Sequence, residues 1–347
     1  MSDLSDAVTR IVGDCCPREA VAGYAGNRIH LALWDALTAA GFTAVSVPEA
    51  YGGSGGTATD AIEIIGVVGR FAGSVPIAES GLLGGWLLAN AGWDVPRGPL
   101  AVAAPESTEV TVVRREDGGL ALDGAVRHVA WLADATELVL LWTAGGESLV
   151  CRLPVETLDV RTGQNIAGES RDTVVLRSHV SPAEYVRRVP THVTREALRV
   201  RGAAARVASA AGALLRIEEL TVRYAGERIQ FGRAINQFQA AQHRLARLAE
   251  DVRLVRTAAT TMVRGDEFSV VDVAAARSVA GTAALAAVAE AHQLHGAIGI
   301  TLEHPLNHFT RRVWSWLDEY GTGTEWSQYL GTGLDVSGDP WTALVGG

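Results

Sequence analysis

With 347 residues, 48% of them hydrophobic, the chain is long enough to bury a sizeable core and too apolar to be intrinsically disordered. A net charge of −9 without a basic tract argues against a nucleic-acid partner, and three cysteines, two of them adjacent (Cys15 and Cys16), predict neither a disulfide framework nor a zinc site. The Ala-rich apolar stretches are short and the first residues do not resemble a signal peptide, so we expect a cytoplasmic protein without a membrane-spanning segment.

The first part of the chain, residues 1–98, is predicted to be a helical domain. "IHLALWDALTAAGF" has apolar residues at helical spacing, and "TAVSVPEAYGGSGG" is expected to be a loop. "TDAIEIIGVVGRFAG" restarts a helix, in which Asp60 is placed to cap the N-terminus and Glu63 to complete a capping box.

Residues 99–190 are predicted to form an antiparallel β domain. Short β-rich runs follow one another here: "EVTVVR", "ELVLLW", "SLVCRL" and "DTVVLRSHV". Turn signals such as "EDGG" and "TAGGE" separate these runs, which favours strands over helices.

Helices return over residues 191–347, which are predicted to form an antiparallel four-helix bundle. One long helix is indicated by apolar residues that recur at alternating spacings of three and four: Phe238, Ala241, Leu245, Leu248, Val252, Val255, Ala259 and Met262. The predicted fold is therefore α+β and multidomain, in the order helices, β domain, helical bundle.

Two local patterns are weighed against other chemistry. "GGSGG" matches the nucleophile motif of hydrolases, but Pro48 and the glycines indicate an open loop instead of a strand-to-helix turn. His292, His295, His304 and His308 share helical spacings, but Pro305 and "GAIG" interrupt any helix joining the two pairs, so no metal site is predicted.

Three sequence blocks together resemble the acyl-CoA dehydrogenase family over nearly the whole chain. They are the helix followed by "VSVPEAYGG", the block "RYAGERIQFGRAINQFQAAQHRLARLAED", and the segment "QLHGAIGITLEHPLNHFTRR". Each is weak alone, but the three occur in the family's order and at its spacing. The chain is similar to the short actinobacterial members, some of which form α2β2 assemblies with a related subunit.

The resemblance implies FAD as cofactor and assigns residues to it. The implied cofactor-binding residues are Arg228, Phe231, Gln239, Gln293, Gly296, Thr322 and Trp131. An arginine suits the pyrophosphate, and the glycine lets the cofactor approach closely because it has no Cβ. In the family, the arginine block reaches the flavin of a neighbouring subunit, which implies a homo- or hetero-oligomer, as in a dimer of dimers. The family's flavin-binding loop is only roughly matched, by Pro105, Glu106 and Ser107 in "VAAPESTEV".

The catalytic base is where the chain departs from the family. Dehydrogenation of an acyl-CoA thioester needs a carboxylate that removes the α-proton. At the usual family position stands Tyr320, followed by Gly321 and Thr322, and at the alternative position stands Gly202. Glu319 would serve after a one-residue slip of the loop.

Two hypotheses follow from this departure. In the first, the chain is an FAD-dependent acyl-CoA dehydrogenase with Glu319 as the base, and an electron-transfer flavoprotein accepts the electrons. In the second, it is a catalytically incomplete subunit that completes the site of a heteromeric partner. Fatty or steroid acyl-CoA thioesters are the substrates that the resemblance suggests.

Overall fold

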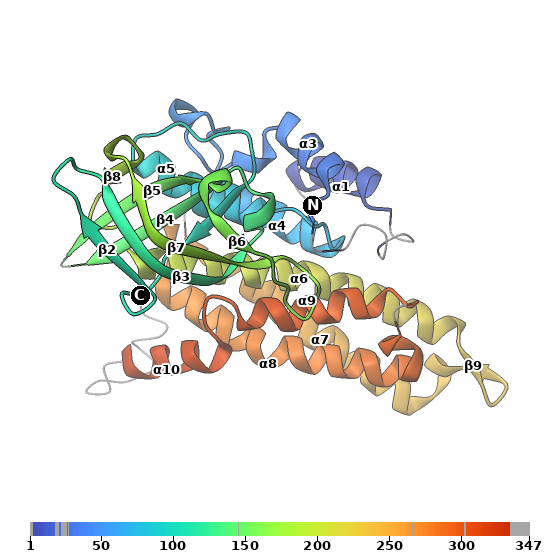
Figure 1. Ribbon diagram of the computed structural model, residues 1–347. Helices are drawn as coiled ribbons and strands as arrows, with labels where there is room; N and C mark the ends of the chain where they lie inside the picture. Colours follow the sequence, from blue (N-terminus) through green and yellow to red (C-terminus); the bar gives the residue numbers. More distant parts are fainter. Residues whose placement is uncertain are drawn as a thin grey trace.

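The computed structural model describes residues 3–17, 21, 26, 28–144, 146–264, 267–301 and 303–333. Figure 1 shows N-terminal helices, a β region and a long helical bundle, in that chain order. The β region lies over one end of the bundle, and the N-terminal helices lie along the same side of it. The predicted fold class is confirmed. The exact domain boundaries, after residues 98 and 190, stay predictions.

The N-terminal part consists of α1 (Asp3–Cys15), α3 (Leu31–Ala39), α4 (Ala58–Arg70), the π-helical segment η3 (Ala78–Gly85) and α5 (Trp86–Asn90). The predicted capping box on α4 is wrong by one helical turn. Thr57 is the N-cap, and Asp60 completes the box by accepting from the Thr57 amide at 2.7 Å. A hydroxyl before the helix thus caps it, and Asp60 is already inside the first turn.

Two four-stranded sheets make up the β region, in the orders β1-β4-β5-β8 and β2-β3-β7-β6. The strands are β1 (Leu100–Ala103), β2 (Val110–Arg114), β3 (Leu120–Ala130), β4 (Glu137–Ala144), β5 (Glu147–Pro154), β6 (Asp159–Arg161), β7 (Arg171–Ser181) and β8 (Val186–Arg188). Apolar side chains from both sheets form a common core. One pair departs from the antiparallel prediction: β1 runs parallel to β4, with Leu100 opposite Glu137.

The bundle consists of α6 (Arg195–Glu227), α7 (Gln239–Thr261), α8 (Val270–His295), α9 (Leu306–Asp318) and α10 (Gly323–Gly333). Hairpins β9 (Ile229–Gln230) with β10 (Arg233–Ala234), and β11 (Val263–Arg264) with β12 (Glu267–Phe268), join its first three helices. The predicted apolar row on α7 is buried from Leu248 to Met262 and only partly covered before it.

Small residues bring α4 and α6 into backbone contact. A Cβ on Gly212 would lie 1.9 Å from the carbonyl oxygen of Gly66, so only glycine permits this crossing. The close approach fixes α6 under the N-terminal helices. Because α6 carries side chains toward the β region as well, its position sets the geometry of the cleft described next.

One apolar segment, Val270–Ile300, is long and hydrophobic enough to cross a membrane by length and composition alone. Here it packs within the bundle against α6, α7 and α10. Over the residues described above, no group of three or more His, Cys, Asp or Glu side chains is arranged to hold a metal ion.

Candidate functional site

A cavity of about 590 Å³ lies where the β region meets the bundle. Its walls come from the end of β1 and the loop after it, from β3, from the loop before β7, and from the C-terminal end of α9. The polar residues that line it on the bundle side include Arg206, Asp318, Glu319 and Tyr320. Segments far apart in the sequence therefore converge on the residues that the sequence singled out for catalysis.

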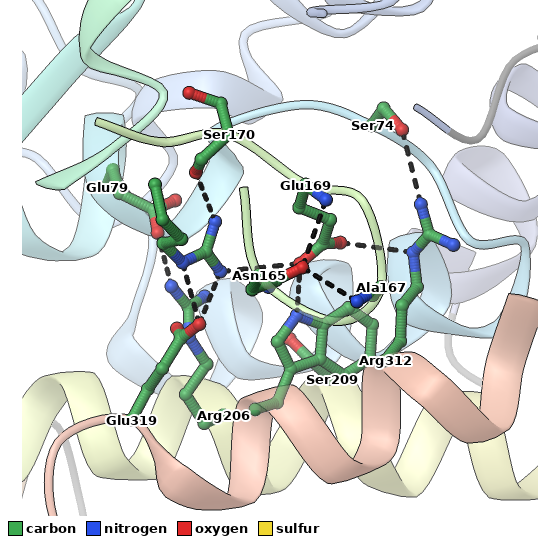
Figure 2. Close-up of polar contacts among 12 residues, drawn as sticks. Ser74, Glu79, Asn165, Ala167, Glu169, Ser170, Arg206, Ser209, Arg312 and Glu319 are labelled. Atoms are coloured by element: carbon green, nitrogen blue, oxygen red, sulfur yellow. Dashed lines mark hydrogen bonds and ion pairs between the residues drawn. The ribbon is translucent and has the colours of Figure 1, made fainter. Parts of the chain in front are cut away.

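Glu319 lies at the C-terminal end of α9, and its carboxylate is held between two arginines. Arg171 Nε donates to Oε1 at 2.7 Å, and Arg206 Nε donates to Oε2 at 2.6 Å. Figure 2 shows the carboxylate reaching from the end of its helix toward Arg206. Both oxygens of the proposed base thus accept charge-assisted hydrogen bonds.

These contacts belong to a buried charge cluster, which consists of Glu79, Glu169, Arg171, Arg206, Arg312 and Glu319. Arg206 also donates to Glu79 at 2.6 Å, and Arg312 donates to Glu169 at 3.0 Å. The indole of Trp316 donates to Glu169 at 3.0 Å as well. Figure 2 shows that the cluster draws side chains from η3, the β region, α6 and α9.

The cluster is electrically balanced, with three carboxylates facing three guanidinium groups. Burial alone would raise the pKa of Glu319, but Arg206 and then Arg171 outweigh it and hold the pKa below its usual range. The carboxylate therefore has little tendency to take up a proton. A base for an α-proton needs the opposite environment, a dry pocket that raises its proton affinity.

Tyr320 occupies the usual family position of the base. Burial raises the pKa of its phenol, which therefore stays protonated, and the Arg206 guanidinium lies 5.6 Å from the ring centroid. The ring covers Gly202 on α6, since a Cβ on that glycine would lie 2.4 Å from ring carbons. The two alternative positions for a base therefore pack against each other, and neither carries a carboxylate.

Arg277 holds the turn that carries these residues. It is 0% exposed and donates to the carbonyl oxygens of Leu317 at 2.6 Å and Glu319 at 3.0 Å, and also to that of Gly321. Tyr320 has a φ of 57° and Gly321 a φ of 98°, so the chain turns sharply here. The arginine thereby satisfies carbonyls that the end of α9 leaves without helical partners.

Thr322 and Trp131, both assigned to the cofactor, lie near this cavity but do not line it. Thr322 caps α10, and its amide and hydroxyl both contact the carboxylate of Glu325. Trp131 is 4% exposed and lines a separate cavity of about 30 Å³ beside Arg171 and Arg206, not the larger cavity. Pro105 lines the larger cavity, whereas Glu106 pairs with Arg195 at 2.9 Å.

The remaining cofactor-binding residues lie together at the opposite end of the bundle, around the β9–β10 hairpin. They are Arg228, Phe231, Gln239, Gln293 and Gly296, and all of them are exposed. Phe231 is 92% exposed, and Gly296 has a φ of 65° with open space where a Cβ would lie. Among the described residues, no carboxylate pairs with Arg228.

Sequence reasoning missed most of the charge cluster. Glu79, Glu169, Arg171 and Arg312 were not singled out, although they surround the predicted base. Arg206 interrupts the Ala-rich apolar stretch "GAAARVASAAGALL". A charged residue inside such a stretch was the one available signal, because a buried charge requires a buried partner.

Comparison with known proteins identifies the family. Residues 192–325 match the acyl-CoA dehydrogenase C-terminal domain, and residues 2–95 match the N-terminal domain. The chain is 29% identical over 316 residues to acyl-CoA dehydrogenase IpdE2 of Mycobacterium tuberculosis, covering 89% of this chain and 88% of that protein. It is 30% identical over 283 residues to IpdE2 of Mycolicibacterium smegmatis, with 81% of each chain covered.

The fold is also shared with a solved structure, the ChsE4–ChsE5 complex from Mycobacterium tuberculosis. The TM-score is 0.85 at 24% identity, and the alignment covers 97% of both chains. The helix, strand and bundle order, the cleft at their junction and the two matching domains lead to one conclusion: this chain belongs to the acyl-CoA dehydrogenase family.

Proposed function

We propose that this chain is the subunit of a heteromeric acyl-CoA dehydrogenase that completes the FAD and substrate site, while a related partner chain supplies the catalytic base. The observation that carries the proposal is the position of the Glu319 carboxylate between Arg171 and Arg206. A carboxylate whose pKa is held low by two guanidinium groups is a weak acceptor for the α-proton of a thioester.

The neighbouring residue does not replace it. A neutral phenol at position 320 has no charge with which to attract a proton, and its ring fills the space over Gly202. The related structure named ChsE4–ChsE5 is a complex of two differently named chains, and a chain of that structure shares the fold described here. That precedent is compatible with a site shared between two unlike subunits.

FAD fits the residues of this chain as two separate groups. Arg228, exposed beside the exposed ring of Phe231, suits the pyrophosphate and adenosine half, and the cavity beside Pro105 suits the ring half. When bound, the flavin supplies the hydride acceptor for dehydrogenation. Gly202 packs against Tyr320 beside the cavity, and Arg228 follows the other end of α6. At about 1.5 Å per residue the two lie about 39 Å apart, and this distance exceeds the length of an extended dinucleotide. Both groups therefore serve FAD only if two chains meet.

The second candidate is the self-sufficient dehydrogenase with Glu319 as base. One observation favours it: Glu319 lines the cavity, and its side chain is 20% exposed. A substrate that displaced Arg171 or Arg206 from the carboxylate would restore its basicity. In both candidates an acyl-CoA thioester is the substrate, an electron-transfer flavoprotein is the acceptor, and the location is cytoplasmic.

The chain offers a matched pair of variants to separate the candidates. Glu79 and Glu319 each accept from Arg206 at 2.6 Å, but of these two only Glu319 lines the cavity of about 590 Å³. If Glu319 is only a counter-ion, Glu319→Gln and Glu79→Gln should lower the stability similarly, by roughly 3 kcal/mol, and have similar effects on flavin bleaching. If Glu319 is the base, only Glu319→Gln should abolish bleaching by acyl-CoA.

The measurement uses the full chain expressed alone and together with a second acyl-CoA dehydrogenase homologue from the same genome. Flavin content per chain and bleaching by acyl-CoA are recorded for wild type and both variants. We expect flavin and bleaching mainly in the co-expressed assembly. A yellow homo-oligomer that is bleached by acyl-CoA, and that loses bleaching only in Glu319→Gln, would overturn the proposal.

A further inference from the structure

A cavity of about 510 Å³, here named the interhelical cavity, lies between α1, α4, α6 and α7. Within the described part of the chain, it shares no lining residue with the cleft described above. At about 3.6 residues per turn, its lining residues on α6 lie on the face of that helix opposite Arg206. They are Ala208, Ala211, Gly212 and Leu215. The interhelical cavity is therefore separate from the candidate functional site.

The interhelical cavity is elongated and mainly aliphatic. The first and last residues of α4 that line it, Thr59 and Arg70, lie about 16 Å apart at about 1.5 Å per residue. Seven aliphatic residues and two glycines line it, against three charged residues. The aliphatic residues are Ile62, Val67, Ala208, Ala211, Leu215, Ala259 and Val263. A long apolar group would bury its surface in such a space.

Two arginines give the lining an excess of positive charge. Arg70 donates from Nη2 to Glu219, but its Nε is buried without a hydrogen-bond partner among the described residues. Arg256 is exposed on α7, and no carboxylate in the described part of the chain pairs with it. Of the lining residues, Glu63 carries the single carboxylate. The charge of the lining therefore favours an anionic group over a cationic one.

The contacts of neighbouring residues place both arginines at the same end of the interhelical cavity. Arg253 of α7 donates to Glu218 of α6 at 3.1 Å. Because the β9–β10 hairpin turns the chain back, α7 runs antiparallel to α6, and Arg256 lies beside the turn of α6 that precedes Glu218. Arg70 reaches Glu219, the next residue on α6. The two guanidinium groups therefore approach the same part of α6 from opposite sides.

We propose that the interhelical cavity is a binding site for an apolar carboxylate. The chain of the ligand lies along α4 and α6 on the aliphatic lining, and its carboxylate is held by Arg70 and Arg256. Guanidinium groups form charge-assisted hydrogen bonds with a carboxylate, and Arg256 has no carboxylate of this chain to occupy it. The inference goes beyond the proposed function and uses no residue of the cleft.

Calorimetric titration of the full chain with decanoate, decan-1-ol and butyrate separates the head group from the tail. Decan-1-ol keeps the tail without the charge, and butyrate keeps the carboxylate with little tail. We expect decanoate to bind at least about tenfold more tightly than decan-1-ol, because its hydrogen bonds are charge-assisted. Butyrate should bind at least about a hundredfold more weakly than decanoate, because it lacks most of the methylenes.

A matched pair of variants tests the role of Arg256. Arg256→Gln should weaken the binding of decanoate about tenfold and leave that of decan-1-ol unchanged, because only the charge is lost. Arg253→Gln removes the arginine one turn earlier on α7, which does not line the interhelical cavity. This control should bind both ligands as the wild type does.

A third variant tests the position of the tail. Ala211→Leu adds a larger side chain to the wall of the interhelical cavity and should weaken decanoate and decan-1-ol alike. Its Tm, compared with that of the wild type, shows whether the fold is kept, and Arg256→Gln tests the site in either case because that side chain is exposed.

Three results would each overturn the site. They are the absence of decanoate binding, equal affinities for decanoate and decan-1-ol, and a decanoate affinity that Arg256→Gln leaves unchanged. Decanoate binding at wild-type strength in a folded Ala211→Leu variant would also overturn it, because the ligand would then lie elsewhere. None of these results concerns flavin content or bleaching, so a failure here leaves the proposed function standing.

Discussion

Arg206 shows how much depends on single residues in this protein. Its guanidinium is buried within an Ala-rich helix and bonds to Glu79 on one side and to Glu319 on the other. Burial opposes its charge, but the two carboxylates outweigh burial and raise its pKa. Removing either partner of such a group leaves an uncompensated buried charge, which is why isolated substitutions here are expected to be severe.

His295 makes the stability depend on pH. It is buried, stacks on Tyr224 at 4.5 Å, and donates from Nδ1 to the carbonyl oxygen of Ala291 at 2.8 Å. Burial lowers the pKa of His295 to about 4, so the unfolded chain, with an ordinary histidine, takes up a proton first as the pH falls. The contribution of neutral His295 to the free energy of unfolding is complete above about pH 6.5 and is lost as the pH falls from about 6.5 to about 4.

At pH 5 the expected loss from this one residue is about 2 kcal/mol of the free energy of unfolding. Urea unfolding of wild type and His295→Phe at pH 7.5 and pH 5 measures it, since the phenylalanine variant should lose about 2 kcal/mol less between the two values. His243→Gln, on the exposed side of α7, serves as control and should follow wild type. Identical pH dependence in wild type and His295→Phe would refute the assignment.

At the scale of elements, α9 ends where the candidate site begins. Glu319 follows its last turn, and Tyr320 and Gly321 then adopt positive φ angles. Arg277 of α8 donates to the carbonyl oxygens of this turn, so a side chain of α8 caps the C-terminal end of α9. The orientation of Glu319 and Tyr320 therefore depends on a residue that does not line the cavity of about 590 Å³.

Arg277→Met should destabilise the chain by roughly 2–3 kcal/mol, because several buried carbonyl oxygens lose their donor. Amide hydrogen exchange should accelerate most at residues 319–322, and Arg277→Lys should recover part of the loss. Arg253→Met, which removes an exposed pair with Glu218, is the matched control and should change stability by less than about 1 kcal/mol. Equal effects of the two methionine variants would contradict the role given to Arg277.

Hydrophobic periodicity made most helices and strands predictable from the sequence. Contacts between residues far apart in the sequence could not be predicted in this way. The α7 row from Leu248 to Met262 was predicted from spacing alone, because burial on one helix face repeats locally. The contact of Arg171 with Glu319 joins residues 148 positions apart and leaves no local pattern. The parallel pairing of β1 with β4 was missed for the same reason, since strand direction depends on where the chain returns.

Local chemistry was predicted less well where two residues compete for one role. On α4, Thr57 and Asp60 both have side chains suited to capping, and the backbone decides which one precedes the first turn. At the cleft, Glu319 was selected for its position beside Tyr320, and the order of residues gave no sign of the two arginines that surround it. The candidate site residues were therefore chosen by position and stay a prediction, and their electrostatic environment left no sign in the sequence.

On the scale of the whole molecule, the residues assigned to FAD divide between the two ends of the bundle. The β9–β10 hairpin projects beyond the helices in Figure 1, and it carries Phe231 at 92% exposure. Ile229 of the same hairpin is 57% exposed as well, and exposed apolar side chains that lie together mark sites where a ligand or partner binds. The exposed hairpin is therefore a candidate contact surface for the second chain of the proposed assembly.

Arg228→Ala and Phe231→Ala should leave the free energy of unfolding of the single chain within about 0.5 kcal/mol of wild type, because both side chains are exposed. The same variants should reduce bound flavin per chain in the co-expressed assembly, as measured by absorbance after gel filtration. Arg177→Ala, an exposed arginine on β7, is the control and should keep its flavin. Full flavin content in both hairpin variants would remove this end of the chain from the cofactor site.

The buried charge cluster has a consequence for how the molecule comes apart. Its members come from the N-terminal helices, the β region and the bundle. Separating any one of these regions from the others would leave buried charged side chains without their partners. The three regions should therefore denature together, in a single cooperative transition, because the N-terminal helices and the bundle also share one apolar core and the cluster ties the β region to it. Fluorescence of the buried tryptophans and far-ultraviolet circular dichroism would then report one common midpoint.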